Sequence, residues 1–239
     1  MQYDLTQQQM TEAIERLAPF VTGHKRQRIE DVLSRRTRHL TVVLENVYQP
    51  HNAGAVVRTC DCFGIQDLHV IEAGNTFSPG ADVTAGAAKW VSVHRHTPTD
   101  RGGGGTPACL KGLKQDGYRL VALTLRGPGT PIHDLPIDRP TALCIGTEED
   151  GLSDSAHALA DDFAHVPMAG FTQSFNLSVT AAVVLYELRN RLDRSSVDWR
   201  LKDQERLALT FEWYAKIVPR SGDHLRAMIN AAQGGTPPP

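Results

Sequence analysis

Three short segments of this 239-residue chain carry polar side chains whose types and spacing could support chemistry. The first is HNAGAVVR at 51–58, in which Asn52 and Arg58 flank small and apolar residues. An asparagine amide donates and accepts hydrogen bonds, and an arginine can grip a phosphate with two parallel ones. Asn52 could instead simply cap a helix that starts after Pro50. Arg58 could likewise form a surface pair with Asp61, three residues further on.

The second segment is a glycine-bounded turn, IGTEEDG at 145–151, which follows an apolar strand. A glycine at the end of a strand lets the backbone come close to a ligand, and Gly146 is placed for that role. Glu148 and Glu149 form either an acid pair for proton transfer or the polar side of an ordinary turn. Both interpretations stay open at this point.

The third segment, VPMAGFTQSFNLS at 166–178, leads into a long apolar helix. Ser174, Asn176 and Ser178 alternate at the start of that helix. Capping of backbone N–H groups accounts for one or two such residues. Three of them, preceded by Gln173, exceed what capping requires, so we expect some of these side chains to face a ligand.

Strands and helices alternate through residues 41–192, and this order positions the three segments. The apolar pattern predicts strands at 41–47, 68–71, 91–93, 118–125, 141–145 and 163–168, and helices at 53–64, 108–116, 153–159 and 176–192. Such alternation predicts an α/β fold, with a parallel sheet covered on both faces. Ligands bind at the carboxyl ends of such strands, which points to the loops at 48–54, 146–151 and 168–176.

Helices are also expected outside the alternating region, at 4–18, 25–34, 203–218 and 223–232. We therefore expect three parts: a basic helical extension at 1–39, a central domain at 40–195, and a C-terminal helical extension at 196–239 with a disordered tail. The helix at 176–192 is apolar over much of its circumference. A helix of this kind is buried on more than one side, so a second subunit is its expected partner.

Charge is distributed unevenly, although the formal net charge is only −2. Residues 24–39 contain six Lys or Arg and two acidic residues, whereas 147–162 contain six acidic residues and no Lys or Arg. A basic arm on an acidic body fits a protein that contacts nucleic acid locally. The basic stretch could equally be the solvated face of an amphipathic helix.

Composition and cysteine spacing disfavour several classes of protein. No apolar run approaches the roughly 18 residues of a membrane span, and the polar N-terminus lacks a secretion pattern, so we expect a cytoplasmic protein. The cysteines lack zinc-type spacing and are expected as reduced core thiols: Cys60, Cys62, Cys109 and Cys144. The glycine-rich stretch at 97–107 lacks the Gly-Lys-Ser/Thr of a phosphate loop and is expected to be an inserted surface loop.

The three segments, taken in this order, resemble the SpoU/TrmH family of RNA ribose 2′-O-methyltransferases. The first motif of that family is an Asn and an Arg around a short run of small residues, matched here by Asn52 and Arg58. The second is a Gly-x-Glu-x-x-Gly turn, matched by Gly146, Glu148 and Gly151. No one segment is specific, but the combination is.

The third motif of the family is Pro-Met followed by Gln-Ser-Leu-Asn-Val-Ser, matched by 167–168 and by QSFNLS at 173–178. Two departures, Phe175 for Leu and Leu177 for Val, should be tolerated beside a cofactor base. The resemblance extends over residues 25–192.

The resemblance is greatest to the branch of the family that modifies a guanosine in the D-loop of transfer RNA. The stretches that suggest this branch are RR at 35–36, LENVYQPHN at 44–52 and DRPT at 138–141, together with the helices after residue 200. Transfer RNA is therefore the implied substrate and partner.

The resemblance also implies a fold and a cofactor. The family has a three-layer α/β domain of the SPOUT type, with a parallel sheet and a C-terminal trefoil knot, flanked here by N- and C-terminal helices. S-adenosyl-L-methionine is the implied cofactor, bound bent in the knot. No metal is implied, because a sulfonium is already a good leaving group. Members are homodimers that pack through the last long helix, which agrees with the apolar helix at 176–192.

The matched residues carry implied catalytic roles. Arg58 would orient the ribose by holding its phosphate, or would act as the base. A guanidinium keeps its proton at neutral pH, so we prefer Arg58 as an orienting group. Asn52 would hold the hydroxyl or the arginine, and Glu148 would shape the pocket. Ser174 and Asn176 would line the reacting centre.

Two further sets of contacts are implied. The cofactor-binding set is Leu143, Gly146, Glu148, Gly151, Val166, Met168, Phe175 and Asn176. The RNA-binding set is Arg26, Arg28, Arg35, Arg36, Arg38 and Arg58.

Three other functions remain open from the sequence. One is a ribosomal RNA methyltransferase of the same family, although only residues 1–39 precede the first strand, where many such enzymes carry a separate RNA-binding domain. Another is a knotted RNA-binding protein that has lost transfer, which the presence of Asn52, Arg58 and Asn176 disfavours. The last is a Rossmann-type nucleotide-binding protein, but no glycine fingerprint follows Val47.

Overall fold

The computed structural model describes residues 5–98 and 104–232. The chain divides into two compact units, which are described separately below. The sheet unit is Thr37–Trp199, and the helical unit combines the two ends of the chain, Met1–Arg36 and Arg200–Pro239. We had expected these ends as two independent extensions and did not foresee that they form one unit.

Two expectations of the sequence analysis fall at least partly outside the described residues. The expected disordered tail includes 233–239, and the expected glycine-rich loop includes 99–103. The end of that loop is helical instead, because α5 begins at Gly105 rather than at residue 108.

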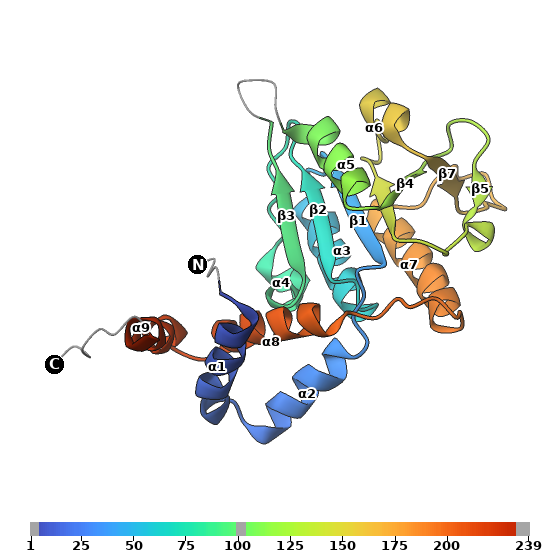
Figure 1. The fold of residues 1–239 in the computed structure, drawn as a ribbon. Coiled ribbons are helices and arrows are strands. Elements are labelled where there is room, and N and C mark those ends of the chain that lie inside the picture. The colour runs from blue at the N-terminus through green and yellow to red at the C-terminus, as the bar shows by residue number, and fades with distance from the viewer. Residues whose placement is uncertain (1–4, 99–103, 233–239) are drawn as a thin grey trace. The chain divides into compact units, whose positions relative to one another are not determined.

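The sheet unit is built on a seven-stranded parallel sheet within the described residues, in the order β3-β2-β1-β6-β4-β7-β5 (Figure 1). The strands are β1 Leu40–Glu45, β2 Asp67–Ile71, β3 Ser92–His96, β4 Arg119–Leu123, β5 Thr130–Pro131, β6 Thr141–Ile145 and β7 Asp162–His165. Every pairing is parallel, so the carboxyl ends of the strands lie along one edge of the sheet.

Helices cover both faces of this sheet and make three layers (Figure 1). One face carries α3 Pro50–Cys62 and α7 Leu177–Asp193, with α4 Ala81–Thr84 beside α3, and the other carries α5 Gly105–Gln115 and α6 Asp154–Leu159. A separate cluster of buried apolar side chains fills the space under each helical layer. The predicted three-layer α/β architecture is therefore confirmed.

Local sequence explains where the helices beside the strand ends begin. Ser153 caps α6, because its hydroxyl accepts a 3.1 Å hydrogen bond from the N–H of Ala156. Asn176 caps α7 through a 2.9 Å bond from the N–H of Ser178. The expectation that Asn52 caps α3 was wrong. The proline at position 50 starts the helix earlier, and Asn52 lies inside its first turn.

The buried carboxylate of Glu45 links three elements at the end of β1. It accepts hydrogen bonds from the hydroxyl of Thr106 on α5, and from the N–H and hydroxyl of Ser153 at 2.8 and 2.7 Å. Three donors compensate for burying a charged group. The Glu45 contacts therefore fix the start of α6, and with it the end of the glycine-bounded turn at 146–151.

Several short elements were not foreseen. They are 3₁₀ turns at Ala18–Phe20, Ala87–Lys89 and Ile132–Asp134, and the two-residue strand β5. The last of these turns is held to α7 by Arg191, which donates to the carbonyl oxygens of Ile132 and Leu135 at 3.1 and 2.8 Å.

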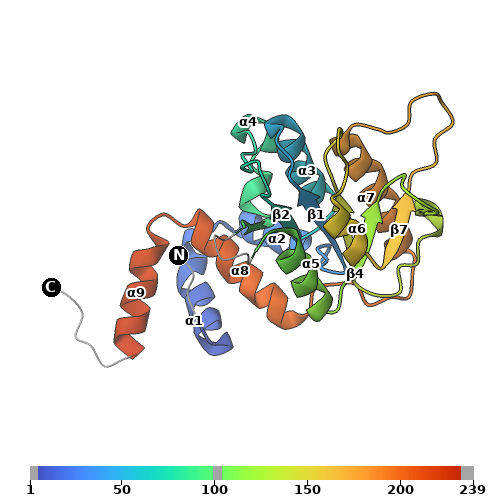
Figure 2. The same ribbon diagram turned by 90° about the horizontal axis from the view of Figure 1, so that it is seen from above.

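The helical unit contains four α-helices in its described part: α1 Gln7–Leu17, α2 Gly23–Leu33, α8 Asp203–Ile217 and α9 Ser221–Ala232. Figure 2 shows α1 beside both α8 and α9, and α2 also packs on α8. Trp213 of α8 is buried, and the guanidinium of Arg36 lies over its ring, 5.4 Å from the centroid. Among the described helices of the whole chain, none has the length and apolar character needed to cross a membrane.

Candidate functional site

A cavity of about 440 Å³ opens at the carboxyl ends of β4, β6 and β7. The loops that follow these strands surround it, at 123–126, 146–152 and 164–175, and the first turns of α7 close one side. This is the edge of the sheet at which ligand binding was predicted. The volume suits a small organic ligand.

The lining of this pocket combines apolar side chains with carboxylates. Leu123, Val166 and Leu177 supply apolar surface, and the consecutive residues 148–150 supply three acidic groups. Arg126 also lines the pocket, but its guanidinium lies 3.2 Å from the carboxylate of Asp154. The lining therefore suits a ligand that has an apolar or aromatic part and carries positive charge.

The glycines of the turn after β6 have separate physical roles. A methyl group on Gly146 would overlap the backbone of Gly151, which crosses directly over it. Gly151 has a φ of 69°, in the left-handed region that favours glycine. Thr147 and Gly151 close the turn with two backbone hydrogen bonds of 3.2 and 3.0 Å. The Gly-x-Glu-x-x-Gly spacing is thus required by a compact turn that holds Glu148 beside the pocket.

One carboxylate brings the three sequence segments together. Oε1 of Glu148 accepts hydrogen bonds from the amide of Asn52 and, at 3.3 Å, from the amide of Asn176. The amide of Asn176 also donates to the side-chain oxygen of Asn52 at 3.2 Å. We call these three residues the amide–carboxylate cluster. Its members come from α3, from the turn after β6 and from the start of α7.

The orientation of both amides follows from the cap of α7. Oδ1 of Asn176 accepts from the N–H and the hydroxyl of Ser178 at 2.9 and 2.7 Å, so its NH₂ group must face the other way, toward Asn52 and Glu148. The oxygen of Asn52 then accepts, and its own NH₂ donates to Glu148 and to Gln49, the latter at 2.8 Å. Taken together, these hydrogen bonds are consistent with one orientation of each amide group.

Most residues predicted to contact the cofactor line this pocket. They are Gly146, Glu148, Gly151, Val166, Met168 and Phe175, together with Ser174 from the predicted catalytic set. Asn176 adjoins the pocket through its bond to Glu148. Leu143 does not fit its predicted role, because it is fully buried within β6, two residues before the strand ends.

The loop at 123–126 was missed by the sequence analysis, although it forms one wall of the pocket. It carries no conspicuous acid, base or paired polar residues. The predicted strand at 118–125 overlaps it, and its place at the carboxyl end of that strand was the signal that could have found it.

Arg58 is not brought to the amide–carboxylate cluster within one chain. It lies six residues after Asn52 on α3, which places the two side chains roughly 120° apart around the helix and about 9 Å apart along it. Arg58 is exposed and lines a shallow hollow of about 350 Å³ that includes Phe63 and Val83. Among the described residues, none forms a hydrogen bond or ion pair with its guanidinium.

An apolar stripe on α7 borders this hollow. Val179, Val183 and Tyr186 are 43%, 36% and 59% exposed, and their spacing places them on one face of the helix. The ring of Tyr186 meets Phe63 of α3 edge-on, with the ring centroids 6.1 Å apart. The side of α7 that faces away from the sheet is therefore an apolar surface that a partner could cover.

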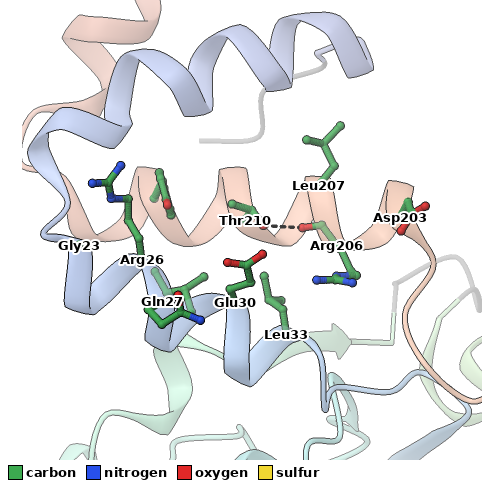
Figure 3. A pocket seen from close by; sticks show the side chains of 11 residues that line it. Gly23, Arg26, Gln27, Glu30, Leu33, Asp203, Arg206, Leu207 and Thr210 are labelled. Carbon is green, nitrogen blue, oxygen red and sulfur yellow. Dashed lines mark hydrogen bonds between the residues drawn. The ribbon is translucent and has the colours of Figure 1, made fainter.

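The predicted RNA-binding arginines fall into two groups. Arg26 and Arg28 of α2, and Arg35 after it, are exposed in the helical unit. Arg26 lines a groove of about 710 Å³ between α2 and α8, to which Arg206 also contributes (Figure 3). Glu30 and other polar side chains lie between these two cations (Figure 3).

Two more arginines of that set, Arg36 and Arg38, do not fit the predicted phosphate contacts. Arg36 is only 1% exposed and stacks on Trp213. Arg38 is committed to Asp67, whose carboxylate lies 2.7 Å from its Nε. The clustering of basic residues in the sequence did not distinguish exposed cations from those used for packing and ion pairing.

The sequence profile of the SpoU rRNA Methylase family matches residues 39–186. A relative in Borreliella burgdorferi, named tRNA (guanosine(18)-2′-O)-methyltransferase, is 38% identical over 215 residues, which cover 90% of this chain and 95% of the relative. That alignment is longer than the sheet unit, so it extends into the helical unit as well.

Solved structures give the same family. The crystal structure of the Aquifex aeolicus TrmH/SpoU tRNA modifying enzyme is 30% identical, has a TM-score of 0.71, and covers 82% of this chain and 98% of its own. The SpoU methyltransferase AviRb from Streptomyces viridochromogenes, solved in complex with the cofactor AdoMet, shares the fold at 24% identity and a TM-score of 0.57. It covers 69% of this chain and 65% of its own.

The geometry of the turn predicts different effects for two glycine substitutions. Gly146→Ala should lower the free energy of unfolding by about 1–3 kcal/mol, because the new methyl group overlaps backbone that cannot move without opening the turn. Gly170→Ala is the matched control, since the nearest atom to its methyl group would be the backbone nitrogen of Thr172 at 4.0 Å, an ordinary contact, and should change stability by less than about 0.5 kcal/mol. Urea unfolding measures both. Equal effects for the two variants would contradict the assigned role of Gly146.

Proposed function

The chain belongs to the SpoU methylase family of RNA methyltransferases, and we propose that it methylates the ribose 2′-hydroxyl of guanosine 18 in the D-loop of transfer RNA. The observation that carries this proposal is the amide–carboxylate cluster, in which Asn52, Glu148 and Asn176 meet beside a ligand-sized pocket. Relatives named for this reaction align over most of the chain. We therefore expect the protein to act in the cytoplasm, where its proposed substrate is found.

S-adenosyl-L-methionine fits the pocket between the three loops. When bound, it supplies a methyl group activated on a sulfonium. The apolar lining, including Leu123, Val166 and Phe175, suits an adenine ring, and backbone groups of the loops can bond to its edge. The three carboxylates at 148–150 complement the positive charge of the sulfonium and the amino group.

The chain's own residues orient the reacting ribose. Ser174 lines the pocket, and Asn52 and Asn176 stand at its border with their amides locked by Glu148. Among the described residues, the side-chain oxygen of Asn52 accepts only from Asn176, so it has a lone pair left for the ribose hydroxyl, and its fixed direction limits the entropy lost when the hydroxyl binds. Because Oε1 of Glu148 accepts from both amides, we assign Glu148 the role of positioning Asn52 and Asn176.

Arg58 requires a second chain to reach a reacting centre. Within one chain it stands apart from Asn52, but its hollow adjoins the apolar stripe of Val179, Val183 and Tyr186. We propose that the stripe is the homodimer interface, as expected for the helix at 176–192. In that arrangement Arg58 of one subunit serves the pocket of the other, where it holds the phosphate next to the ribose.

RNA binding is assigned to the exposed arginines of the helical unit. Arg26, Arg28 and Arg35 remain from the predicted set, and Arg206 joins Arg26 along the groove shown in Figure 3. Phosphate contacts of this kind position RNA without reading its sequence. The trefoil knot implied by the family resemblance stays a prediction for this chain.

A labelled-methyl assay tests the proposed reaction. The purified protein is incubated with labelled S-adenosyl-L-methionine and, in separate reactions, unmodified transfer RNA or ribosomal RNA, and the label is mapped by digestion. We expect a single 2′-O-methylguanosine in the D-loop, and a transcript with deoxyguanosine at position 18 serves as the control that cannot accept the group. Label on ribosomal RNA alone would replace the proposed substrate with that of the second candidate, a ribosomal RNA methyltransferase.

The shared-site proposal predicts complementation between two inactive variants. Asn52→Ala and Arg58→Ala should each abolish transfer, while Arg58→Ala keeps its affinity for the cofactor. If each site combines Asn52 of one subunit with Arg58 of the other, an isolated heterodimer of the two variants has one intact site. It should recover about half of wild-type turnover. An inactive heterodimer would contradict the shared site and indicate that Arg58 acts in the site of its own chain.

Substituting exposed arginines should weaken RNA binding in a salt-dependent way. Arg26→Ala combined with Arg35→Ala should raise the KM for transfer RNA and reduce the slope of log affinity against log salt by about 1–2, since two phosphate contacts are lost. Lys111→Ala on α5 removes a positive charge outside the basic segment and is the control. If the KM and the slope were unchanged in the double variant, the basic segment would be a solvated helix face and not an RNA-binding surface.

A further inference from the structure

Three histidines and a buried cysteine gather on the face of the sheet covered by α5, near its β3 edge. His69 lies on β2, His94 and His96 on β3, and Cys109 on α5. Nδ1 of His69 and Nε2 of His96 are 3.1 Å apart. One ligand atom each of His69, His96 and Cys109 lies within 4.8 Å of the other two.

The fold explains why these side chains meet. Side chains alternate across a strand, so His94 and His96 point to the same face of β3, and β2 pairs in parallel register with His69 opposite His94. Cys109 faces the sheet from α5. Thr97 directly follows His96, and Gly104 packs so closely on the carbonyl of Thr97 that no side chain fits at position 104.

The cluster offers the chemistry of a transition-metal site. Two imidazole nitrogens and a thiolate are the ligands that Zn²⁺ prefers. In tetrahedral coordination two ring nitrogens lie about 3.3 Å apart and a nitrogen and sulfur about 3.6 Å apart, estimated from Zn–N and Zn–S bond lengths. The His69–His96 separation of 3.1 Å is close to the first of these values, and the sulfur of Cys109 lies within 4.8 Å of both nitrogens.

His94 lies outside the group of three side chains whose ligand atoms come together. Its Nε2 lies 2.8 Å from the carboxylate of Asp67, which also binds Arg38. Its ring stacks on that of His69, with centroids 4.6 Å apart, and so fixes the plane of the His69 ring.

The state of the two imidazoles also suits metal binding. Burial, together with the neighbouring His94 and His96, lowers the pKa of His69 to about 4, and burial lowers the pKa of His96. Neutral imidazole is the form that binds a metal. Burial raises the pKa of Cys109 to about 12, so its thiol keeps its proton until a cation displaces it.

We propose that His69, His96 and Cys109 bind a zinc ion, with water in the fourth position. On binding, the Cys109 thiol loses its proton to solvent as the Zn–S bond forms, and no oxidant or reductant is involved. His69 and His96 are partly exposed, which leaves a path for the ion and room for water. The bound ion ties β2, β3 and α5 together at the end of β3. The site shares no residue with the methyltransferase pocket.

Cobalt substitution tests this site. The full-length, tag-free protein is treated with a chelator and titrated with Co²⁺, whose visible bands and thiolate charge-transfer band report four-coordinate binding through sulfur. We expect one equivalent to bind with both signals, Zn²⁺ to displace it, and Zn²⁺ to raise the Tm of the apoprotein. Absence of the thiolate band, or a Tm that Zn²⁺ leaves unchanged, would overturn the proposal and leave a hydrogen-bonded histidine pair.

Matched variants separate this site from adventitious binding to other histidines. Cys109→Ser and His96→Gln should each weaken Co²⁺ binding by more than about tenfold and remove the Tm shift. Cys144→Ala removes another buried thiol of the same core cluster, and His94→Gln removes the stacked ring, so both should keep the thiolate band. Circular dichroism checks that each variant folds. A thiolate band that survives Cys109→Ser but disappears in Cys144→Ala would overturn the assignment.

Discussion

The candidate site depends on one shared hydrogen-bond acceptor, the carboxylate of Glu148. Two amides, from α3 and from the start of α7, donate to the same oxygen, although Asn52 and Asn176 are 124 positions apart in the sequence. The surrounding structure keeps these groups in reach of one another. The glycines at 146 and 151 shape the turn that carries Glu148, and the cap formed by Asn176 fixes the direction of its amide.

The hydrogen bonds of this cluster orient the two amides but contribute little to the stability of the fold. Its members lie at the border of an open pocket, where a hydrogen bond contributes only about 1 kcal/mol net. The stability of the sheet unit comes instead from the two apolar clusters on either side of the sheet and from buried groups such as Glu45. The core therefore holds the elements that carry the reacting groups in place, and the hydrogen bonds of the cluster set the direction of the two amides.

Sequence patterns predicted the regular elements better than the contacts between them. Alternating apolar segments predicted the parallel sheet, and the polar residues after its strands predicted the edge that holds the pocket. The predictions that were wrong concerned residues whose roles depend on tertiary contacts. Asn52 bonds to Glu148 and does not cap α3, and Arg36 stacks on Trp213. The pocket wall at 123–126 carries no pattern of residues that would mark it in the sequence. The histidine and cysteine cluster was invisible because its spacing, 69, 96 and 109, has meaning only once the strands pair.

The most direct test of the central claim compares Glu148→Ala with its neighbour Glu149→Ala. Both remove one exposed carboxylate from the pocket lining, but only Glu148 bonds to the two asparagines. At saturating cofactor, methyl transfer to transfer RNA should fall about 100-fold in Glu148→Ala, since the amides lose their fixed direction, and should change little in Glu149→Ala. Equal turnover in the two variants would contradict the claim that the Glu148 carboxylate organises the site.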